Sequence, residues 1–415
     1  MNKVFNREEK WHILSEEAKK RGGNGDELVA AMKKLYSVYS EDMLVWLGGL
    51  FDAKIGGFYY SASAKNNDGY LPDIESTYQA IVLLQRAGVI DSYDRLPEWV
   101  RRRIAGFICS LEDPDNGYFY HPQWSKSLVD AKVSRKGRDL NWAVTLSYWL
   151  DFKLPYPNAN ERLRESLSEN SAADLKMFSS EKQIREYIDS LDFKNNRTVS
   201  IHRLISQAGQ INAAGFSDII LEFFNSILDE KTGIFPKDIT ISDIYSLYGI
   251  SSLYRSVFKT MMPGSSRFAE ILLSKFLCEG ADFPVNNICH IRNAWGFMDN
   301  TIFLLREYGN KEDKIYAENL SLRLLRQAPA AISYTTRVIS GFKKPTGAFS
   351  FSLEGSPKTS QGVPIAPEST VGGDVNATTI SVGMINSIFK AMGLSEFMIN
   401  LFEPESFDKF LCTIS

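Results

Sequence analysis

The chain has 415 residues and is poor in cysteine, and neither sign of charge dominates. Its four cysteines are scattered with no CxxC pair, so neither a disulfide framework nor a cysteine-rich zinc site is indicated. Lys and Arg number 47 against 50 Asp and Glu, which excludes the basic surface that nucleic-acid binding requires. The glycine-rich run at 21–26 lacks the strand and the Lys-Ser/Thr of a phosphate-binding loop. We therefore predict no nucleic-acid partner, no cofactor and no metal.

Long apolar runs are also missing. The sequence contains no stretch of about 18 uncharged apolar residues, which a membrane-spanning helix would need. Its first ten residues, Met1–Lys10, carry no apolar segment of the kind found in signal peptides. We expect no membrane span and a cytoplasmic location in which the thiols stay reduced.

The chain does contain a repeated pattern. Residues 56–61 begin with glycine and aromatic residues, and Asp73-Ile74-Glu75-Ser76-Thr77 follows them after a loop. Residues 347–352 have the same character, and Asp374-Val375-Asn376-Ala377-Thr378 follows them. Both copies begin an apolar segment with the same order of residue types, which is Asp, a β-branched residue, any residue, a small residue and Thr. A pattern that recurs at such a distance is typical of repeat architectures.

Weaker copies begin near Asn116, Gly233 and Phe283, and a sixth begins near Ser200. Each unit predicts a loop and two helices, so we predict an all-α fold, an (α/α)6 toroid of six helix hairpins, in a single domain spanning 1–415. Two segments depart from this rhythm. Residues from about 155 to 197 form a polar excursion, and the long Gly-, Ser- and Pro-rich loop at 343–373 is expected to be a lid.

The helical spacing within one unit separates an inner from an outer layer. Ile74, Tyr78, Ile81 and Leu84 keep the spacing of a helix, and apolar neighbours fill its other side, which indicates a buried inner helix. The segment at 96–111 is apolar on one side only and predicts an outer helix. Aspartate at a helix start caps free backbone N–H groups, and the glycine before the aromatic residue permits a turn where a Cβ would clash.

One segment carries a family resemblance. Residues 103–119 run through Phe107, Glu112 and Asn116-Gly117 to Tyr118-Phe119. This segment resembles the repeat of squalene cyclases and protein prenyltransferase β-subunits, where Gln stands in place of Glu112. Residues 73–78 are also similar to the starts of inner helices in those families. The resemblance covers about three of the six units and implies the α/α-toroid fold, which hosts many activities.

The motifs that carry chemistry in those families are not matched. Class II terpene cyclases have an acidic DxDD motif, whereas the nearest segment here, residues 113–116, lies in a predicted turn. Prenyltransferase β-subunits bind zinc through Asp, Cys and His, and lanthionine cyclases through a Cys-His-Gly motif. Here Ile291 follows Cys289-His290 without a supporting partner motif. We predict no metal, and whether Cys289 or His290 ever binds one stays open.

In such a ring the N-terminal ends of the inner helices converge at one mouth. We therefore predict that Asp73, Asp139, Asp243, His290 and Asp374 lie at such ends, that Glu75 reaches the cavity beside an arginine, Arg138, and that His290 also reaches it. The candidate catalytic residues are Glu75, Asp73, Arg138, Asp139, His290 and Asp374. The candidate substrate-binding residues are Tyr60, His121, Trp124, Trp142, Asp243, Arg292, Asn293, Trp295 and Asn376.

A purely structural role is an alternative for each of these residues. A capping aspartate, a core histidine or an internal ion pair would explain most of them individually.

Carboxylates, histidine, arginines and aromatic rings around one concavity suit acid–base chemistry on a polar ring substrate. We therefore expect a cytoplasmic carbohydrate-active enzyme, a glycoside hydrolase or lyase, acting on a small and acidic oligosaccharide. One alternative is a terpenoid cyclase or prenyl-handling enzyme. Another is a non-catalytic toroid that binds a peptide or partner. The sequence does not distinguish between a hydrolase, a lyase and a cyclase. It gives neither the substrate nor the oligomeric state.

Overall fold

The computed structural model describes residues 6–168, 178, 180–367 and 371–414, and this part of the chain is mostly helical. The strands are two residues long and form two small hairpins, β1 (Phe51–Asp52) with β2 (Gly57–Phe58) and β3 (Thr359–Ser360) with β4 (Val363–Pro364). The α-helices are α1 (Arg7–Lys20), α2 (Gly25–Tyr36), α3 (Asp42–Gly48), α4 (Ala62–Lys65), α5 (Ile74–Arg86), α6 (Glu98–Leu111), α7 (Lys126–Ala131), α8 (Val133–Trp149), α9 (Ala159–Ser168), α10 (Glu181–Asp189), α11 (Arg197–Ala213), α12 (Ser217–Leu228), α13 (Ile241–Leu253), α14 (Ser265–Ile271), α15 (Ile288–Tyr308), α16 (Lys311–Ser340), α17 (Val375–Ala391) and α18 (Phe407–Leu411). The prediction of an all-α chain is confirmed.

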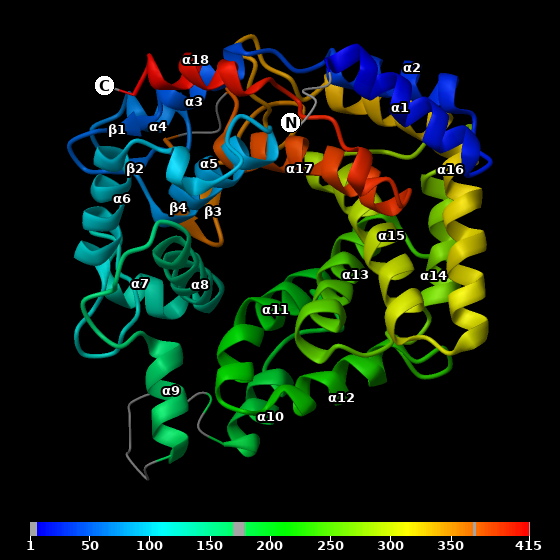
Figure 1. Ribbon diagram of the computed structural model, residues 1–415. Helices are drawn as coiled ribbons and strands as arrows, with labels where there is room; N and C mark the ends of the chain where they lie inside the picture. The colour runs from blue at the N-terminus through cyan, green and yellow to red at the C-terminus, as the bar shows by residue number, and fades with distance from the viewer. Residues whose placement is uncertain (1–5, 169–177, 179, 368–370, 415) are drawn as a thin grey trace.

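Six of these helices pack against one another in succession. α5 packs on α8, α8 on α11, α11 on α13, α13 on α15, α15 on α17, and α17 packs again on α5 (Figure 1). α15 is buried on nearly every side, as its consecutive buried residues 293–298 show. α6 instead buries a single face, with Val100, Ile104, Phe107, Ile108 and Leu111 inward. The difference follows the expected distinction between helices that are apolar all round and helices with one apolar stripe.

The repeated sequence pattern corresponds to a repeated set of hydrogen bonds. Asp73 and Asp374 are the N-caps of α5 and α17, and each accepts a backbone N–H three residues later. Thr77 Oγ1 donates to the Asp73 carbonyl over 2.8 Å and accepts from the Phe58 N–H over 3.0 Å. Thr378 makes the equivalent bonds to Asp374 and Phe349 over 2.7 and 3.0 Å. The threonine therefore joins the helix start to the preceding glycine–aromatic turn in both copies.

The repeat glycines occupy backbone conformations that other residues avoid. Gly56, Gly117 and Gly347 have φ angles of +93°, +68° and +81°. A Cβ at Gly56 would lie 2.1 Å from the Arg103 carbonyl oxygen, and one at Gly117 would lie 2.5 Å from that of Pro157. The prediction that these positions need glycine is confirmed, because both the positive φ and the close backbone approach exclude a side chain.

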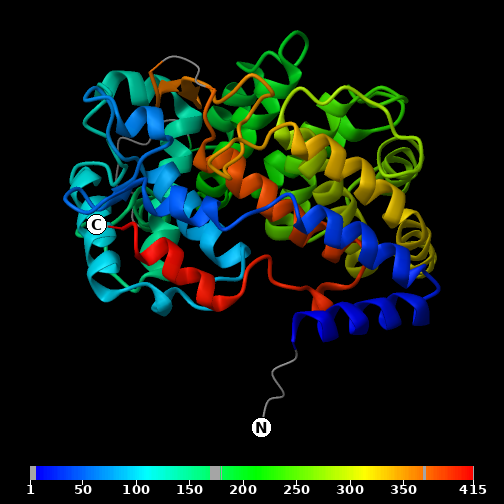
Figure 2. The same cartoon turned by 90° about the horizontal axis from the view of Figure 1, so that it is seen from above.

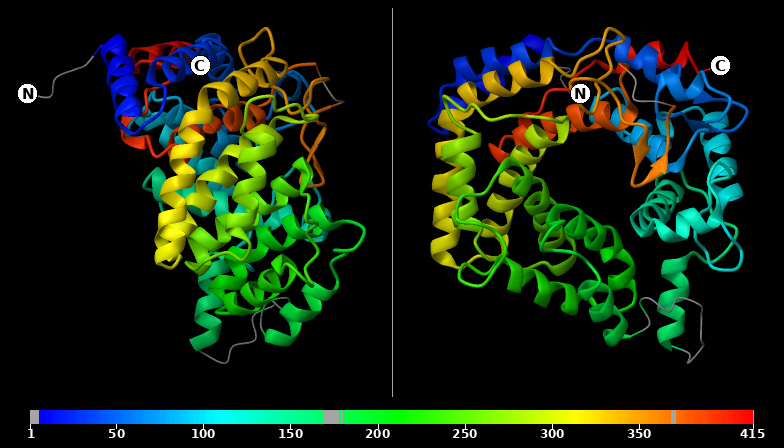
Figure 3. Two further views of the ribbon diagram at one scale, coloured as in Figure 1. Left: turned by 90° about the vertical axis from the view of Figure 1, so that its right-hand side faces the viewer. Right: turned by 180° about the vertical axis from the view of Figure 1, so that it is seen from behind.

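The segment between α16 and α17 contains the β3–β4 hairpin. It lies on the face of the molecule opposite to α1 and α18 (Figures 2 and 3). Residues 368–370 of the proposed lid lie outside the described residues. The polar excursion at about 155–197 contains α9 and α10, and residues 169–177 and 179 of it also lie outside the described part of the chain. That 1–415 is a single domain stays a prediction.

Two predicted helix starts differ from the structure. Asp139 lies inside α8, because this helix begins earlier, at Val133. The helix continues through Gly137, which packs closely on α11. Asp243 is not the N-cap of α13. Thr240 takes that position, and Asp243 completes a capping box by accepting the Thr240 N–H over 2.8 Å. His290 is the third residue of α15, after the N-cap Asn287.

Among the described residues no helix is both long and apolar enough to cross a membrane.

Candidate functional site

A cavity of about 440 Å3 lies where α8, α11, α13, α15 and α17 meet the loop before α17. This volume is in the range of about 300–1,000 Å3 that is usual for small-molecule sites. Most of the helical side chains that line it come from the first two turns of their helices, so helix starts far apart in sequence do converge here. Its polar lining includes Tyr60, Arg138, His202, Tyr245, Tyr248, Arg292, Asn293, Asn376, Thr359, Ser360 and Gln361.

Two arginines face this cavity without a carboxylate partner. No Asp or Glu side-chain oxygen among the described residues lies within 4.0 Å of the Arg138 or Arg292 guanidinium. Arg138 Nε donates to Ser206 Oγ over 3.3 Å, and Arg292 Nη1 donates to Asn293 Oδ1 over 3.2 Å. The Arg292 guanidinium also lies 4.4 Å from the Tyr248 ring centroid, while its buried Nε has no hydrogen-bond partner in this part of the chain.

His202 and Tyr245 form an adjacent pair in the same lining. Their ring centroids are 4.1 Å apart. Burial, with the positive charge of Arg138, lowers the pKa of His202 to about 3, so the imidazole is neutral near neutral pH. Its Nε2 is buried and finds no partner in the described part of the chain. Burial raises the pKa of Tyr245 to about 12, which keeps the phenol protonated.

The described lining of this cavity contains no aspartate or glutamate. The two guanidinium groups without carboxylate partners make the lining itself positively charged, because its imidazole is neutral. Both arginines are partly exposed, and an anionic ligand in the cavity would supply the counter-charge that the described residues do not. Cys289 also faces the cavity, and burial raises the pKa of its thiol to about 12.

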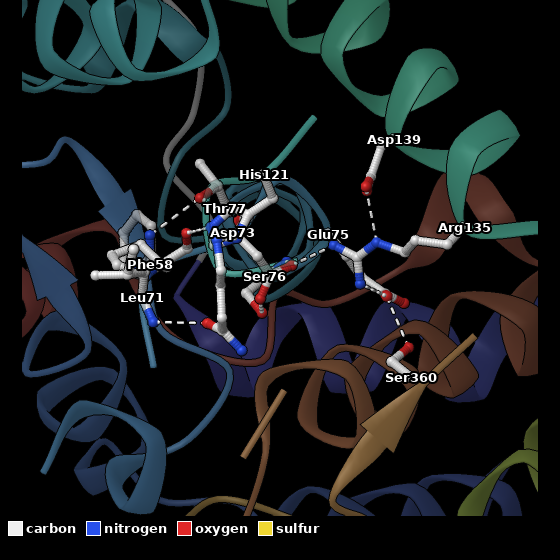
Figure 4. A network of polar contacts seen from close by, with 12 residues as sticks. Phe58, Leu71, Asp73, Glu75, Ser76, Thr77, His121, Arg135, Asp139 and Ser360 are labelled. Carbon is white, nitrogen blue, oxygen red and sulfur yellow. Dashed lines mark hydrogen bonds and ion pairs between the residues drawn. The ribbon is translucent and has the colours of Figure 1, made fainter. Parts of the chain in front are cut away.

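The predicted carboxylates are gathered instead around a fully buried arginine, Arg135. Figure 4 shows its side chain between Asp139 of its own helix and two acidic residues from the start of α5. Nη2 donates to Asp73 Oδ1 over 2.9 Å, and Nη1 donates to Glu75 Oε2 over 3.1 Å. Nε donates to Asp139 Oδ2 over 2.8 Å. The Trp124 ring lies 4.5 Å from the guanidinium carbon. We call Arg135, Asp73, Glu75 and Asp139 the acidic cluster.

Three carboxylates share one guanidinium in the acidic cluster, and the charge is not balanced. Burial raises the pKa of Asp139 to about 7, against the pull of Arg135, and its Oδ1 has no hydrogen-bond partner in the described chain. The partner predicted for Glu75 was Arg138. The structure places Arg135 there, because Arg135 lies one helical turn before Asp139 and so shares its face of α8.

The acidic cluster is connected to the cavity through the β3–β4 hairpin. Ser360 Oγ donates to Glu75 Oε2 over 2.7 Å, and Ser360 also lines the cavity. The far side of the hairpin is held by Trp124 Nε1 and Gln123 Nε2, which both donate to the Pro364 carbonyl, over 2.7 and 2.9 Å. The loop predicted as a lid therefore borders the cavity and is fixed to α5 by a hydrogen bond.

Asp374 forms a second buried carboxylate site beside the cavity. Its Oδ2 accepts from Ser356 Oγ over 2.8 Å, and its Oδ1 accepts the Ala377 N–H over 2.7 Å. Burial raises the pKa of Asp374 to about 6, although hydrogen bonds to these groups and to Tyr60 oppose the shift. Burial and the Asp374 charge also raise the pKa of Tyr60.

The structure thus divides the predicted site residues into three sets. Arg138, Tyr60, Arg292, Asn293 and Asn376 line the cavity. Asp73, Glu75, Asp139 and Asp374 are buried beside it. The remaining six belong to local structure or to the core: His121, Trp124, Trp142, Asp243, His290 and Trp295.

The contacts of that third set are as follows. His121 Nε2 bonds the Pro72 carbonyl, Trp142 stacks on Tyr78, and Trp295 Nε1 donates to Thr335. Asp243 pairs with Arg197. His290 bonds Asn287 through Nε2, and burial lowers its pKa. It is not among the residues that line the cavity.

Sequence reasoning did not select Arg135, His202, Tyr245 or Ser360 as site residues. The Arg135–Asp139 pair carries a usable signal, the i, i+4 spacing of an ion pair on one helix face. His202 lies close to Ser200, near which the sixth unit was expected to begin, but no local pattern marked it as a site residue.

The described residues contain no group of three or more His, Cys, Asp or Glu side chains that could hold a metal ion. Comparison of the chain with protein-family models, curated proteins and solved structures gave no match.

Proposed function

We propose that this chain is an enzyme that binds a small acidic oligosaccharide in the cavity and cleaves it by elimination. The observation that carries the proposal is the lining itself. Two arginines without carboxylate partners and an asparagine, Asn293, face the same space as a neutral histidine and a protonated tyrosine. A sugar carboxylate would neutralise the arginines.

The choice of elimination over hydrolysis rests on the position of the carboxylates. Glycoside hydrolases of the common type place two carboxyl groups on either side of the scissile bond. The described lining has none, and Asp73, Glu75 and Asp139 are engaged with Arg135. Elimination needs cations or amides on the sugar carboxylate, a base for the adjacent C–H and an acid for the leaving oxygen.

We assign those roles within the cavity. Arg138, Arg292 and Asn293 would hold the uronate carboxylate and stabilise the charge that develops on it as the C5 proton leaves. His202 Nε2, which has no described partner, would accept that proton. The electron pair then forms the C4–C5 double bond as the C4–O bond breaks, and Tyr245 gives its proton to the leaving oxygen. The imidazolium returns a proton to the tyrosinate, so the step is balanced.

The fold proposal follows from the packing of the helices. α5, α8, α11, α13, α15 and α17 would be the inner ring of an (α/α)6 toroid, with the cavity at the mouth where their N-termini converge. This proposal is supported by the closed order of their contacts and agrees with the resemblance to the cyclase and prenyltransferase repeats. A cytoplasmic location is part of the same proposal and is consistent with four free cysteines.

A prenyl diphosphate is the second candidate substrate. The two unpaired arginines would suit a diphosphate, and the apolar lining residues Ile205, Leu253, Phe351 and Ile380 would suit a prenyl chain. The Asn293 amide beside Arg292 and the polar hairpin at the cavity favour a sugar.

The test is incubation of the full chain with galacturonate and glucuronate oligosaccharides and their neutral counterparts. Two signals are followed, the ultraviolet absorbance of the conjugated unsaturated product and the number of new reducing ends. Elimination raises both in equal amounts. Hydrolysis raises reducing ends alone and would refute the elimination mechanism, whereas binding without either signal indicates a non-catalytic protein. His202→Gln and Tyr245→Phe should remove turnover, and His12→Gln, at an exposed histidine, is the matched control.

A further inference from the structure

A second cavity, of about 460 Å3, borders the first. It is lined by residues 131–134 at the start of α8, by α10 and α11, and by the turn of the β3–β4 hairpin. Three residues line both cavities: His202, Tyr245 and Gln361. The histidine–tyrosine pair therefore lies on the boundary between two separate spaces.

The second cavity has the same charge character as the first. Its lining carries two cations, Lys132 and Arg203, and no aspartate or glutamate. Neither cation has a carboxylate oxygen within 4.0 Å among the described residues. Two neighbours, Lys136 and Arg197, are both paired, with Asp130 and Asp243. These two neighbours line neither cavity, so the unpaired Lys132 and Arg203 differ from them in facing the second cavity.

Lys132 lies against the turn of the β3–β4 hairpin in the lining of the second cavity. Gly362 has a φ angle of +86°, and a Cβ there would lie 2.9 Å from Lys132 Cδ. The lysine stem therefore packs on a turn that only glycine accommodates without strain. The hairpin is held in turn by the bond from Ser360 to Glu75. Tyr187 also lines the second cavity, and its buried hydroxyl has no hydrogen-bond partner in the described chain.

We infer that the second cavity is a binding subsite for another anionic sugar unit, on the opposite side of the scissile bond from the Arg138–Arg292 subsite. This inference rests on the proposed function. Because the two spaces meet at His202 and Tyr245, a chain that occupies both would place its linkage at that pair. The substrate is then an oligomer with acidic groups on both sides of the cleaved bond, rather than a single uronate with a neutral leaving group.

The test is calorimetric titration of the full chain with galacturonate and glucuronate, each as the monosaccharide and as oligomers of increasing length. We expect the oligomers to bind at least about tenfold more tightly than the monosaccharide, because the second acidic unit adds charge-assisted hydrogen bonds of its own. Lys132→Ala with Arg203→Ala should remove that gain and leave monosaccharide binding unchanged. Arg138→Ala with Arg292→Ala should weaken both.

Lys182→Ala, at an exposed lysine that lines neither cavity, is the matched control and should keep the gain. Lys132→Gln with Arg203→Gln repeats the test should the alanine variant fold poorly. Monosaccharide binding that depends on Arg138 and Arg292, with no gain from length or a gain that survives in the Lys132 and Arg203 variants, would overturn the second subsite alone. Absence of binding by every uronate would overturn the proposed function together with it.

Discussion

Arg135 Nη1 lies 3.1 Å from Glu75 Oε2, and both side chains are almost wholly buried. They come from α8 and α5, two helices that are adjacent in the packing order. Since Glu75 also accepts the Ser360 hydroxyl, this pair joins two helices and the hairpin at the cavity. Asp73, Glu75 and Asp139, which the sequence analysis selected as catalytic candidates, therefore stabilise the structure around the cavity and do not line it.

Arg135→Ala should strongly destabilise the chain. It would leave three buried carboxylates without their cation, and removing one partner of a buried ion pair typically costs about 3–5 kcal/mol. Denaturant unfolding of the variant measures the loss. Arg102→Ala is the control, because its pair with Glu98 is exposed and should contribute about 1 kcal/mol or less. Equal effects of the two substitutions would contradict the structural role of the acidic cluster.

Asp139 should make stability depend on pH. Burial raises its pKa from 3.8 to about 7, so between these values the folded chain holds a proton that the unfolded chain releases. Its contribution is complete below about pH 4 and is lost as the pH rises through 7. Unfolding of Asp139→Asn and of the parent should be compared across this range. As the pH rises, the free energy of unfolding of the variant should increase relative to that of the parent by at least about 1 kcal/mol. A difference between the two that is independent of pH would rule out this titration.

Ser360→Ala should loosen the β3–β4 hairpin. The variant loses the hydroxyl that donates to Glu75, and a hydrogen bond to a charged group contributes about 1.5–3 kcal/mol. Hydrogen exchange should become faster in residues 356–366 and stay unchanged in α13 and α15. Lys358→Ala, at an exposed neighbour, is the control. Unaltered exchange in Ser360→Ala would show that the hairpin does not depend on this bond.

Two glycines that look alike in the sequence should respond in opposite ways to alanine. Gly56→Ala should destabilise by more than about 1 kcal/mol, since its φ is +93° and its Cβ would meet the Arg103 carbonyl. Gly106→Ala should stabilise by about 0.4–1 kcal/mol, because it lies exposed inside α6 with nothing within 4 Å of the new Cβ. Thermal melting of the two variants measures both changes in stability. A stable Gly56→Ala would contradict the turn geometry.

Sequence reasoning succeeded where the determinants are local. The caps at Asp73 and Asp374 and the one-sided burial of α6 depend on neighbours within a few residues, and both were predicted. The repeat glycines were also predicted, although the carbonyls that exclude a Cβ there, those of Arg103 and Pro157, are distant in the sequence. Asp139 was misplaced because an aspartate before an apolar segment predicts a helix start, whereas α8 begins at Val133 and continues through Gly137, where a Cβ would clash with Ser206 of α11. That contact is not visible in the sequence.

The candidate site required long-range information. Arg138, Arg292 and Asn293 were selected because helix starts converge in a ring, and the structure places them in one cavity. The separation of carboxylates from that cavity could not be predicted. It depends on Arg135 reaching Asp73 and Glu75, 62 and 60 positions away in the chain.

The central claim is that the cavity between Arg138 and Arg292 selects a sugar carboxylate. The most direct measurement is calorimetric titration of the protein with glucuronate and with glucose, repeated on Arg138→Gln with Arg292→Gln. The account predicts that the parent binds glucuronate at least about tenfold more tightly than glucose, as charge-assisted hydrogen bonds imply, and that the double variant loses this preference. Equal affinity of the parent for the two sugars, or a preference that survives in the double variant, would contradict it.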